Sequence, residues 1–297
     1  MSAVSDRIRR EFAANDAIRD AGLTTPGDVR RFDDVAYGSH PQQKLDVYRP
    51  KNAEGLLPVI VSVHGGGWVY GDKELYQYYT MELARRGFAV VNFSYRLAPE
   101  SRFPAQLEDV NAVFCWTKEN AEKYGFDMEH LFAVGDSAGA HLLGLYCDFR
   151  TNPGYASRFS FDGGAGPVPK AVSLACGAYS MRLKDAPARG QDLELMADLL
   201  PGEVNAESLA LVDVLKHITP AFPPTFLFTS SGDFLQEQAD ELQKTLRMHK
   251  VPHIMRFYGS ADLILEHVFQ ENIRTESAKI CNDEQCDFFR KVMEEKT

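Results

Sequence analysis

Short apolar runs rich in Val, Ile and Phe alternate along the chain with longer segments of mixed polarity. The strand-like runs cover 58–65, 87–95, 130–136, 170–177, 224–230 and 252–258. The segments predicted as helices cover 75–86, 104–124, 137–148, 234–249 and 272–294. Apolar strands separated by helices indicate a mostly parallel sheet that is covered on both faces. The pattern therefore predicts an α/β fold with a doubly wound core.

The remaining segments complete this plan. Two strand-like stretches, 31–38 and 43–50, predict an antiparallel hairpin that leads into the parallel core. The polar, helical N-terminus and a stretch interrupted by Pro and Gly do not fit the alternation. We expect one domain over 1–297, in which about 1–30 and 178–218 form a small helical cap over one end of the sheet. A frayed terminus and a long surface insertion are the alternative interpretation.

Composition excludes several classes of protein. With 297 residues and 44% hydrophobic content the chain can bury a large core, and its net charge of −10 argues against a nucleic-acid partner. No apolar stretch has the length of a signal peptide or a membrane span, so no membrane partner is expected. Five scattered cysteines fit a reducing compartment, and the sequence predicts a cytoplasmic protein without a metal centre. It favours neither a monomer nor a homodimer.

The stretch "GDSAG" at 135–139 follows an apolar run and precedes a helical segment. This is the G-x-S-x-G pattern of a nucleophile elbow, in which a sharp strand-to-helix turn exposes a serine hydroxyl. The alternative is a tight turn in which the serine only caps the helix. We expect the side chain of Asp136 to point away from Ser137 and to have a structural role.

The stretch "HGGGW" at 64–68 also follows a predicted strand. Consecutive glycines let backbone N–H groups converge on one point, as the oxyanion of an acyl-transfer reaction requires. Both stretches come at the carboxyl ends of strands, where open α/β sheets bind ligands. His64 itself is expected to orient this loop by hydrogen bonds.

A serine nucleophile needs a base and an acid, which in this sheet order follow it as acid and then histidine. Asp233 comes after the strand-like run 224–230, and His267 comes between the last run and the final helix. Of the eight histidines, five precede Asp233, one lies in a helix and one begins a strand at the opposite end from the site. Asp262 and Glu266 remain as alternative acids.

With these motifs, the chain resembles the hormone-sensitive lipase-like esterases of the α/β-hydrolase fold. The resemblance covers nearly all of 40–295. It rests on motifs in family order: "HGGGW", "YRLAPE", "FPAQLED", "GDSAG", "SGDFL" and "HVF". The chain departs from the family pattern at Ala140, at Val268 and in the segment "ADLILE" before His267. These departures bear on the shape of the substrate pocket and leave the reaction alone.

The resemblance implies a role for each matching residue. Ser137 is the nucleophile, His267 the general base and Asp233 the acid that orients it. The oxyanion hole is formed by N–H groups of Gly65, Gly66 and Ala138.

The implied reaction is hydrolysis of a small-molecule ester through an acyl-enzyme, without a cofactor. Aromatic residues near the expected mouth, Trp68, Tyr70 and Tyr78 among them, favour short, partly apolar acyl esters; they would otherwise face a half-buried helix. A carbohydrate acetyl esterase or an arylformamidase-type amidase would use the same triad. A non-catalytic small-molecule-binding protein of this fold is the remaining alternative.

Overall fold

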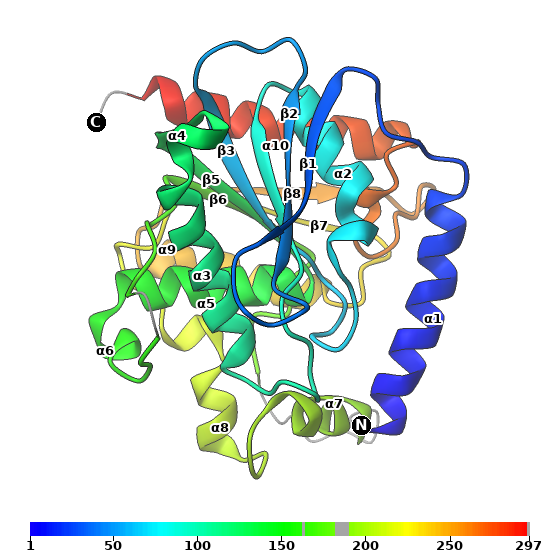
Figure 1. The fold of residues 1–297 in the computed structure, drawn as a ribbon. Coiled ribbons are helices and arrows are strands. Elements are labelled where there is room, and N and C mark those ends of the chain that lie inside the picture. Colours follow the sequence, from blue (N-terminus) through cyan, green and yellow to red (C-terminus); the bar gives the residue numbers. More distant parts are fainter. Residues whose placement is uncertain (162–163, 182–189, 296–297) are drawn as a thin grey trace.

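The computed structural model describes residues 1–161, 164–181 and 190–295, and Figure 1 shows a central sheet between layers of helices. The strands are β1 (Val29–Ala36), β2 (Lys44–Pro50), β3 (Leu57–Val63), β4 (Ala89–Phe93), β5 (Phe126–Asp136), β6 (Ala171–Ala175), β7 (Thr225–Ser230) and β8 (His253–Tyr258). The longer helices are α1 (Ala3–Asp20), α2 (Lys73–Arg85), α3 (Ala105–Glu119), α5 (Ala138–Thr151), α7 (Gly190–Leu199), α9 (Gln236–Met248) and α10 (Glu276–Glu294). The short helices are α4 (Ala121–Tyr124), α6 (Pro153–Ala156), α8 (Ala206–Leu211), η2 (Val214–Lys216) and η3 (Phe269–Glu271).

The sheet has eight strands in the order β1-β2-β4-β3-β5-β6-β7-β8. β2 pairs antiparallel with both β1 and β4, whereas every pair from β4 to β8 is parallel. The predicted hairpin and the six predicted core strands are thus confirmed. Because β3, β5, β7 and β8 run in the same direction, the loops that follow them emerge at one edge of the sheet.

Two hydrophobic cores cover the two faces of the sheet. Along β3, Val59, Val61 and Val63 point into the core formed with α3, α5 and α9, whereas Ile60 points into the core formed with α2 and α10. This alternation follows from the period of two along a strand. All four side chains are fully buried, as expected of a central strand covered on both faces.

One predicted helix is interrupted. The expectation of a helix over 104–124 is replaced by α3 and α4, which are separated by Asn120. The Asn120 side chain donates to the Trp116 carbonyl oxygen over 2.9 Å. Asparagine competes in this way with the helical backbone and favours helix ends, which accounts for the break.

The N-terminal helix α1 packs against α7, although the two are far apart in sequence; Figure 1 shows the N-terminal end of α1 beside α7 at the bottom of the molecule. The contact includes Asp198, whose carboxylate accepts the Ser5 hydroxyl over 2.5 Å and the Ser2 N–H over 2.8 Å. Part of the predicted cap, 182–189, lies outside the described residues. The proposal that 1–30 and 178–218 act together as a cap is supported by the α1–α7 contact.

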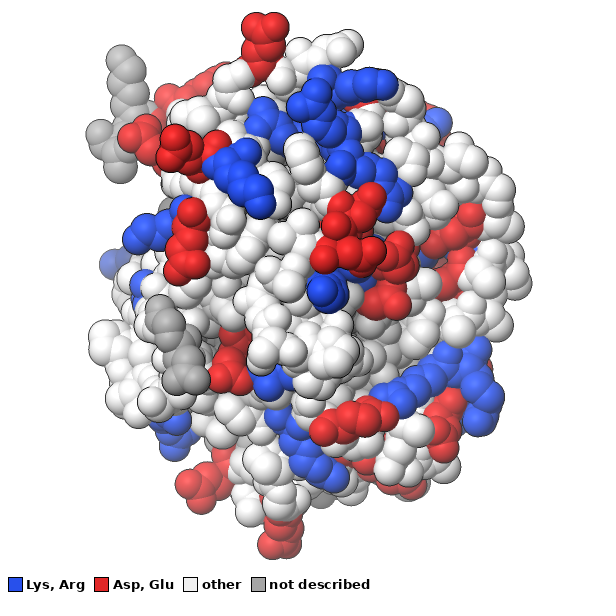
Figure 2. Space-filling view, in the orientation of Figure 1, with Lys and Arg blue, Asp and Glu red and all other residues white. Residues whose placement is uncertain are grey.

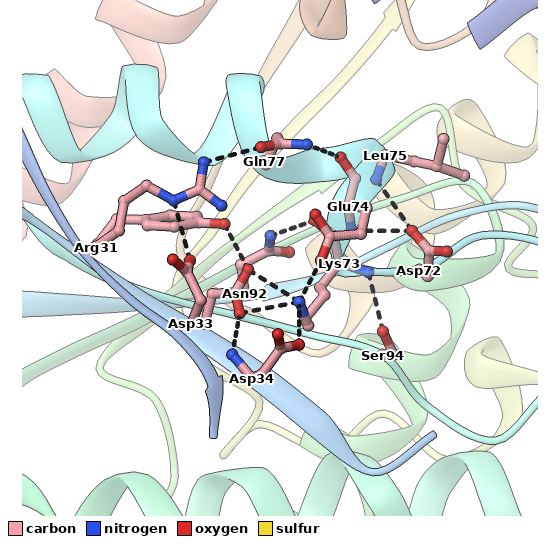
Figure 3. A network of polar contacts seen from close by, with 12 residues as sticks. Arg31, Asp33, Asp34, Asp72, Lys73, Glu74, Leu75, Gln77, Asn92 and Ser94 are labelled. Atoms are coloured by element: carbon pink, nitrogen blue, oxygen red, sulfur yellow. Dashed lines mark hydrogen bonds and ion pairs between the residues drawn. The ribbon is translucent and has the colours of Figure 1, made fainter. Parts of the chain in front are cut away.

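A buried lysine ties the start of α2 to three strands, as Figure 3 shows. The Lys73 ammonium lies 3.0 Å from Asp46 Oδ1 and 2.9 Å from Asp34 Oδ1, and it also pairs with Glu74. The Lys73 backbone bonds to Asn92 and to Ser94. We call Lys73, Asp34, Asp46 and Glu74 the Lys73 cluster. It fixes the N-terminus of α2 against the edge of the sheet formed by β1, β2 and β4.

On the face shown in Figure 2, basic side chains lie beside acidic ones and do not form a continuous basic stripe among the described residues. The expectation that the chain does not bind nucleic acid stays a prediction. Within the described residues, none of the helices combines the length and the apolar character needed to cross a bilayer.

Candidate active site

Ser137 lies in the sharp turn between β5 and α5. Its backbone has φ 49° and ψ −118°, a conformation that a non-glycine residue adopts only under strain. A side chain at Gly139 would collide with the Val63 carbonyl oxygen, so only glycine lets the start of α5 approach β3. The Ser137 N–H donates to the Ala175 carbonyl oxygen over 2.9 Å, which fixes the turn against β6. The elbow predicted from "GDSAG" therefore has the expected strand–turn–helix geometry.

Asp233 and His267 lie on the loops that follow β7 and β8. His267 Nδ1 is 2.7 Å from Asp233 Oδ1, and Asp233 Oδ2 accepts the Thr229 hydroxyl over 2.6 Å. Burial raises the pKa of Asp233, but the hydrogen bonds from His267 and Thr229 outweigh it and hold the pKa below its ordinary value. Asp233 is therefore a carboxylate at neutral pH, as the partner of a catalytic histidine must be.

Within the described parts of the chain, neither alternative acid is hydrogen-bonded to the His267 ring. Asp262 is exposed, and its N–H bonds to the Ser260 hydroxyl. Glu266 forms a backbone bridge with Gly232 that joins the loops after β7 and β8. Of the three acids that the sequence left open, Asp233 is the one bonded to His267.

The serine, the acid and the histidine converge through β6. Cys176 follows Ala175, the residue that accepts the Ser137 N–H. The Cys176 thiol, the Asp233 carboxylate and the His267 ring offer atoms that all lie within 4.8 Å of one another. Ser137, Asp233 and His267 thus share one neighbourhood at one edge of the sheet.

These ligand-type side chains do not suit a resident metal ion. The thiolate is the form of cysteine that binds metals, and burial raises the pKa of Cys176 well above its ordinary value, so the thiol stays protonated. Both Asp233 oxygens are already engaged, Oδ1 with His267 and Oδ2 with the Thr229 hydroxyl. The expectation of a site without metal or cofactor stays a prediction.

The loop after β3 has an unusual backbone path. Gly66, Gly67 and Trp68 all have positive φ, and a side chain at Gly66 would collide with the Tyr70 carbonyl oxygen. The N–H groups of Gly66 and Gly67 have no hydrogen-bond acceptor within the described parts of the chain. The Ala138 N–H, at the first position of α5, belongs to the helix N-terminal groups that lack an intrahelical partner.

Gly65 differs from its neighbours because its N–H is already engaged. It donates to the Tyr76 hydroxyl over 2.8 Å. This observation revises the part expected of Gly65: its N–H serves to anchor the loop to α2. The donors that this loop presents unpaired are those of Gly66 and Gly67, the second of which the sequence analysis did not single out.

His64 and Trp68 anchor the two ends of this loop. His64 is fully buried, stacks on Tyr95 at 3.9 Å between ring centroids, and its Nδ1 lies 2.8 Å from the Gly65 carbonyl oxygen. Burial lowers the pKa of His64 to about 4, so it is neutral, in agreement with its expected structural role. Trp68 was expected to bind substrate, but it is buried and donates its indole N–H to His141 Nδ1 over 3.0 Å. This contact gives Trp68 a structural part in holding the loop on α5.

Tyr70 and Tyr78 were also expected at the mouth of the site. The Tyr70 hydroxyl donates to Asp16 of α1 over 2.9 Å, and the Tyr78 hydroxyl donates to the Leu23 carbonyl oxygen over 3.0 Å. Both tyrosines therefore attach the N-terminal segment to the body of the protein. A role for either of them in substrate binding finds no support in these contacts.

A second group of polar residues lies behind the elbow. The Tyr76 hydroxyl donates to Asp136 Oδ2 over 2.7 Å. The buried carboxyl group of Asp136 faces that of Glu271, which pairs with Arg19 of α1. The structural role expected of Asp136 agrees with this position. Glu271 and Arg19 were not predicted as site residues. For Glu271, the only signal in the sequence was that an acidic residue comes shortly after "HVF". For Arg19 there was none, because the N-terminal helix contains several arginines and nothing in the sequence distinguishes this one.

Helices α1 and α7 both reach the loop after β3. The space above Gly67 is bordered by Ile8 of α1 and Leu195 of α7, whose methyl groups would lie 3.7 and 3.8 Å from a side chain at that position. Both predicted cap segments therefore supply apolar contacts next to the unpaired N–H groups.

Comparison with known sequences agrees with this geometry. A model of the BD-FAE family matches residues 45–246. Esterase LipC of Mycobacterium tuberculosis is 28% identical over 220 residues, which are 72% of this chain and 54% of LipC. The probable carboxylic ester hydrolase LipM of the same organism is 30% identical over 71% of this chain and 52% of LipM. The chain thus spans about half the length of these curated relatives.

Solved structures give the same result for the fold. Esterase B from Lactobacillus rhamnosis superposes with a TM-score of 0.88 at 24% identity, over 99% of this chain and 97% of that one. A second crystal structure of the same esterase, with a C4-C4 tributyrin phosphonate inhibitor, gives 0.87 at 25% identity, over 98% and 95%. These likenesses confirm the predicted fold, and the esterase relatives found by sequence agree with the resemblance stated from the motifs.

Proposed function

Since the chain belongs to the BD-FAE family and has esterase relatives, we propose that it is a serine carboxylesterase that acts on short-chain, partly apolar acyl esters. The observation that carries this proposal is the 2.7 Å bond between His267 Nδ1 and Asp233 Oδ1, beside the strained turn of Ser137. An oriented histidine at the same edge of the sheet as a serine in a strained strand-to-helix turn is the arrangement that acyl transfer requires.

In the proposed reaction, Ser137 Oγ attacks the ester carbonyl carbon while His267 takes the hydroxyl proton. The tetrahedral intermediate collapses, the bond to the alcohol oxygen breaks, and His267 returns the proton to the leaving alcohol. Water then loses a proton to His267 and attacks the acyl-enzyme, which releases the acid and restores Ser137. Asp233 orients the ring and stabilises the imidazolium without taking the proton.

The oxyanion that forms in each step needs donors. We assign this role to the N–H groups of Gly66, Gly67 and Ala138, and Gly65 supports them through its bond to Tyr76. Each donor of this kind stabilises the transition state by about 3–4 kcal/mol. No cofactor takes part in the proposed reaction.

An exposed apolar rim beside His267 supports the choice of substrate class. The Phe234 ring packs on the His267 ring with 4.2 Å between centroids, yet its side chain is 72% exposed. Leu263 and Ile264, in the segment "ADLILE", are 53% and 54% exposed. Exposed apolar side chains that gather next to a catalytic group favour an apolar substrate moiety over a sugar.

We also propose a cellular location for the protein. All five cysteines are free thiols, four of them buried. Thiols that persist unpaired favour a reducing compartment, and we keep the cytoplasm as the proposed location.

The test is hydrolysis of p-nitrophenyl esters from acetate to decanoate by the wild type and by Ser137→Ala. We expect turnover that is highest for short chains and lost in Ser137→Ala, whereas Ser157→Ala, which removes an exposed hydroxyl, keeps the wild-type rate. A folded wild type without turnover on any of these esters would contradict the proposal, and so would a Ser137→Ala variant that retains the wild-type rate.

The rim is tested separately. Phe234→Ala is expected to raise KM for butyrate and longer esters about fivefold, because roughly 1 kcal/mol of apolar contact is lost from each bound substrate. Its kcat should change little, since Phe234 offers no polar group to the reaction. An equal KM for all chain lengths in the variant and the wild type would exclude the rim from substrate binding.

A further inference from the structure

The N-terminal helix inserts a cation behind the catalytic serine. Arg19, in the last turn of α1, has only 15% of its side chain exposed. Its guanidinium pairs with Glu271 and lies 2.9 Å from Asp16 and 2.8 Å from Asp20. It also donates to the Leu75 carbonyl oxygen over 2.8 Å. A surface helix is therefore joined to a buried carboxylate on the far side of the elbow.

Glu271 and Asp136 form a buried pair of carboxyl groups. Their exposed fractions are 5% and 3%, and a hydrogen bond joins them when one of the two is protonated. Glu271 Oε1 has no N–H or hydroxyl donor among the described residues. A hydrogen bond between two carboxyl groups requires a proton on one of them, because like charges at this separation repel strongly.

The proton belongs on Asp136. Burial and the neighbouring Glu271 raise the pKa of Asp136 well above its ordinary value, and Arg19 faces Glu271 directly. The hydrogen bonds then run in one direction: from the Gly65 N–H to the Tyr76 hydroxyl, from this hydroxyl to Asp136, and from the Asp136 carboxyl proton to Glu271. The negative charge of the chain ends on Glu271, against the cation.

We propose that Arg19, Glu271, Asp136 and Tyr76 form a positioning relay by which the N-terminal helix holds the oxyanion loop and keeps negative charge away from it. This inference rests on the proposed esterase function. None of the four is a catalytic residue, since they act through Gly65 and the loop that follows it. We call these four residues the Arg19 relay.

The location of Asp136 explains why the charge matters. A side chain at Gly65 would collide with Asp136 Oδ2, so this carboxyl group lies directly against the backbone of the oxyanion loop. A negative charge there would oppose the charge that develops on the substrate oxygen, and it would be little screened in a buried setting. The relay places the charge one residue further away and neutralises it with Arg19.

If α1 had only a structural role, loss of any residue that anchors this helix should have the same effect on kcat. Arg9 offers a matched anchor: it pairs with Glu100 at 2.7 Å and donates to the Val69 carbonyl oxygen over 2.8 Å. Arg9 holds the same helix, but among the described residues it forms no hydrogen bond or ion pair with Glu271 or Asp136. Comparison of the two arginines therefore separates docking of α1 from the relay.

The experiment measures kcat and KM for p-nitrophenyl acetate in the wild type, Arg19→Gln, Arg9→Gln and Arg19→Gln/Glu271→Gln, with the Tm of each. Arg19→Gln is expected to lower kcat roughly tenfold with KM within about twofold of wild type, because misplacing a donor costs less than removing it. Arg9→Gln should lower Tm but not kcat. The double variant should recover most of the lost kcat, because a neutral amide at position 271 accepts from Asp136 without needing a cation.

Each outcome has a definite meaning. An equal kcat in Arg19→Gln and Arg9→Gln would overturn the relay, as would a double variant no faster than Arg19→Gln. A wild type that hydrolyses no ester would instead overturn the proposed function, and the relay with it. An active wild type with an unaffected Arg19→Gln would overturn the relay alone.

Discussion

Helix α2 carries two buried ion clusters within its first two turns, and their surroundings differ. At the helix start, Lys73 places one cation among the carboxylates of the Lys73 cluster, between α2 and the strands β1, β2 and β4. Three residues later, Tyr76 enters the Arg19 relay, in which two buried carboxyl groups face a cation supplied by another helix. In the Lys73 cluster the cation lies among the carboxylates. In the Arg19 relay the cation lies at one end of the chain of hydrogen bonds.

Both clusters bury charge, so each is expected to be costly to disrupt. Only the Arg19 relay lies behind Ser137 and the oxyanion loop, at the carboxyl ends of the strands. The comparison teaches that the chemistry of a buried ion pair does not decide whether it affects the reaction. Its position relative to the catalytic edge of the sheet does.

The largest effect is expected at Lys73. Lys73→Met leaves Asp46, whose side chain is fully buried, without its cation, and we expect the free energy of unfolding to fall by about 3–5 kcal/mol. The value of kcat for the molecules that remain folded should not change. Urea unfolding and ester hydrolysis at low temperature measure the two quantities. Lys279→Met, at an exposed pair, is the control and should cost less than about 0.5 kcal/mol.

In the Arg19 relay, a substitution should lower kcat strongly and stability only moderately. Tyr76→Phe removes the hydroxyl that links Gly65 to Asp136, and we expect kcat to fall about tenfold, with roughly 1–2 kcal/mol lost from the free energy of unfolding. Tyr78→Phe, on the same helix, loses one hydrogen bond to Leu23 and should keep the wild-type kcat. Equal kcat in the two variants would erase the difference between the two clusters.

The clusters should also respond to pH with opposite signs. The pKa of Asp136 is raised in the folded protein by burial and by Glu271, so its contribution to stability is present below pH 3.8 and is lost as pH rises towards the raised pKa. Asp136→Asn removes this loss, and its stability relative to wild type should increase with pH by up to about 1.4 kcal/mol per unit. Arg19 and Tyr76 are the other groups that face Asp136.

The pKa of Asp34 is lowered by its hydrogen bond to Lys73, so its contribution is present above pH 3.8 and is lost as pH falls. Asp34→Asn should therefore approach the stability of wild type at low pH. Urea unfolding of both variants between pH 2 and 8 tests the two signs, because the Asp34 contribution changes below pH 3.8 and the Asp136 contribution changes above it. Parallel curves for the two variants would contradict the assignment of the proton to Asp136.

The smallest effect is expected beside the histidine. Val268 has φ 54°, a left-handed conformation that a β-branched residue adopts only under strain. Val268→Gly should raise the free energy of unfolding by about 1 kcal/mol, the balance between relieved strain and added chain entropy. Val168→Gly, at an exposed position without positive φ, should lower it instead. A destabilised Val268→Gly would show that the strain is smaller than the cost of glycine.

Much of this architecture could be predicted from the sequence, because its signals are local. The apolar runs predicted the strands of the parallel sheet, and "GDSAG" predicted the elbow at Ser137. Chain order, with Asp233 before His267, predicted the pair that the structure joins by a hydrogen bond. The geometry of a motif such as "GDSAG" is determined by residues that are adjacent in the sequence.

Contacts between distant segments could not be predicted in this way. Trp68, Tyr70 and Tyr78 were expected at the substrate, but their polar atoms bond to His141, Asp16 and Leu23. An aromatic side chain looks the same in a sequence whether it meets a ligand or another helix. Glu271 and Arg19 could not be predicted for the same reason, because the role of each depends on the other, which lies more than two hundred residues away in the sequence.

The central claim is that Ser137 is the nucleophile of an esterase. The most direct measurement is mass spectrometry of the protein after incubation with diethyl p-nitrophenyl phosphate, an acyl-ester mimic that phosphorylates activated serines. We predict one adduct per chain on the peptide that contains Ser137, absent in Ser137→Ala and formed more slowly in Asp233→Asn. An active wild type that carries the adduct on another residue, or that remains unmodified, would contradict the account.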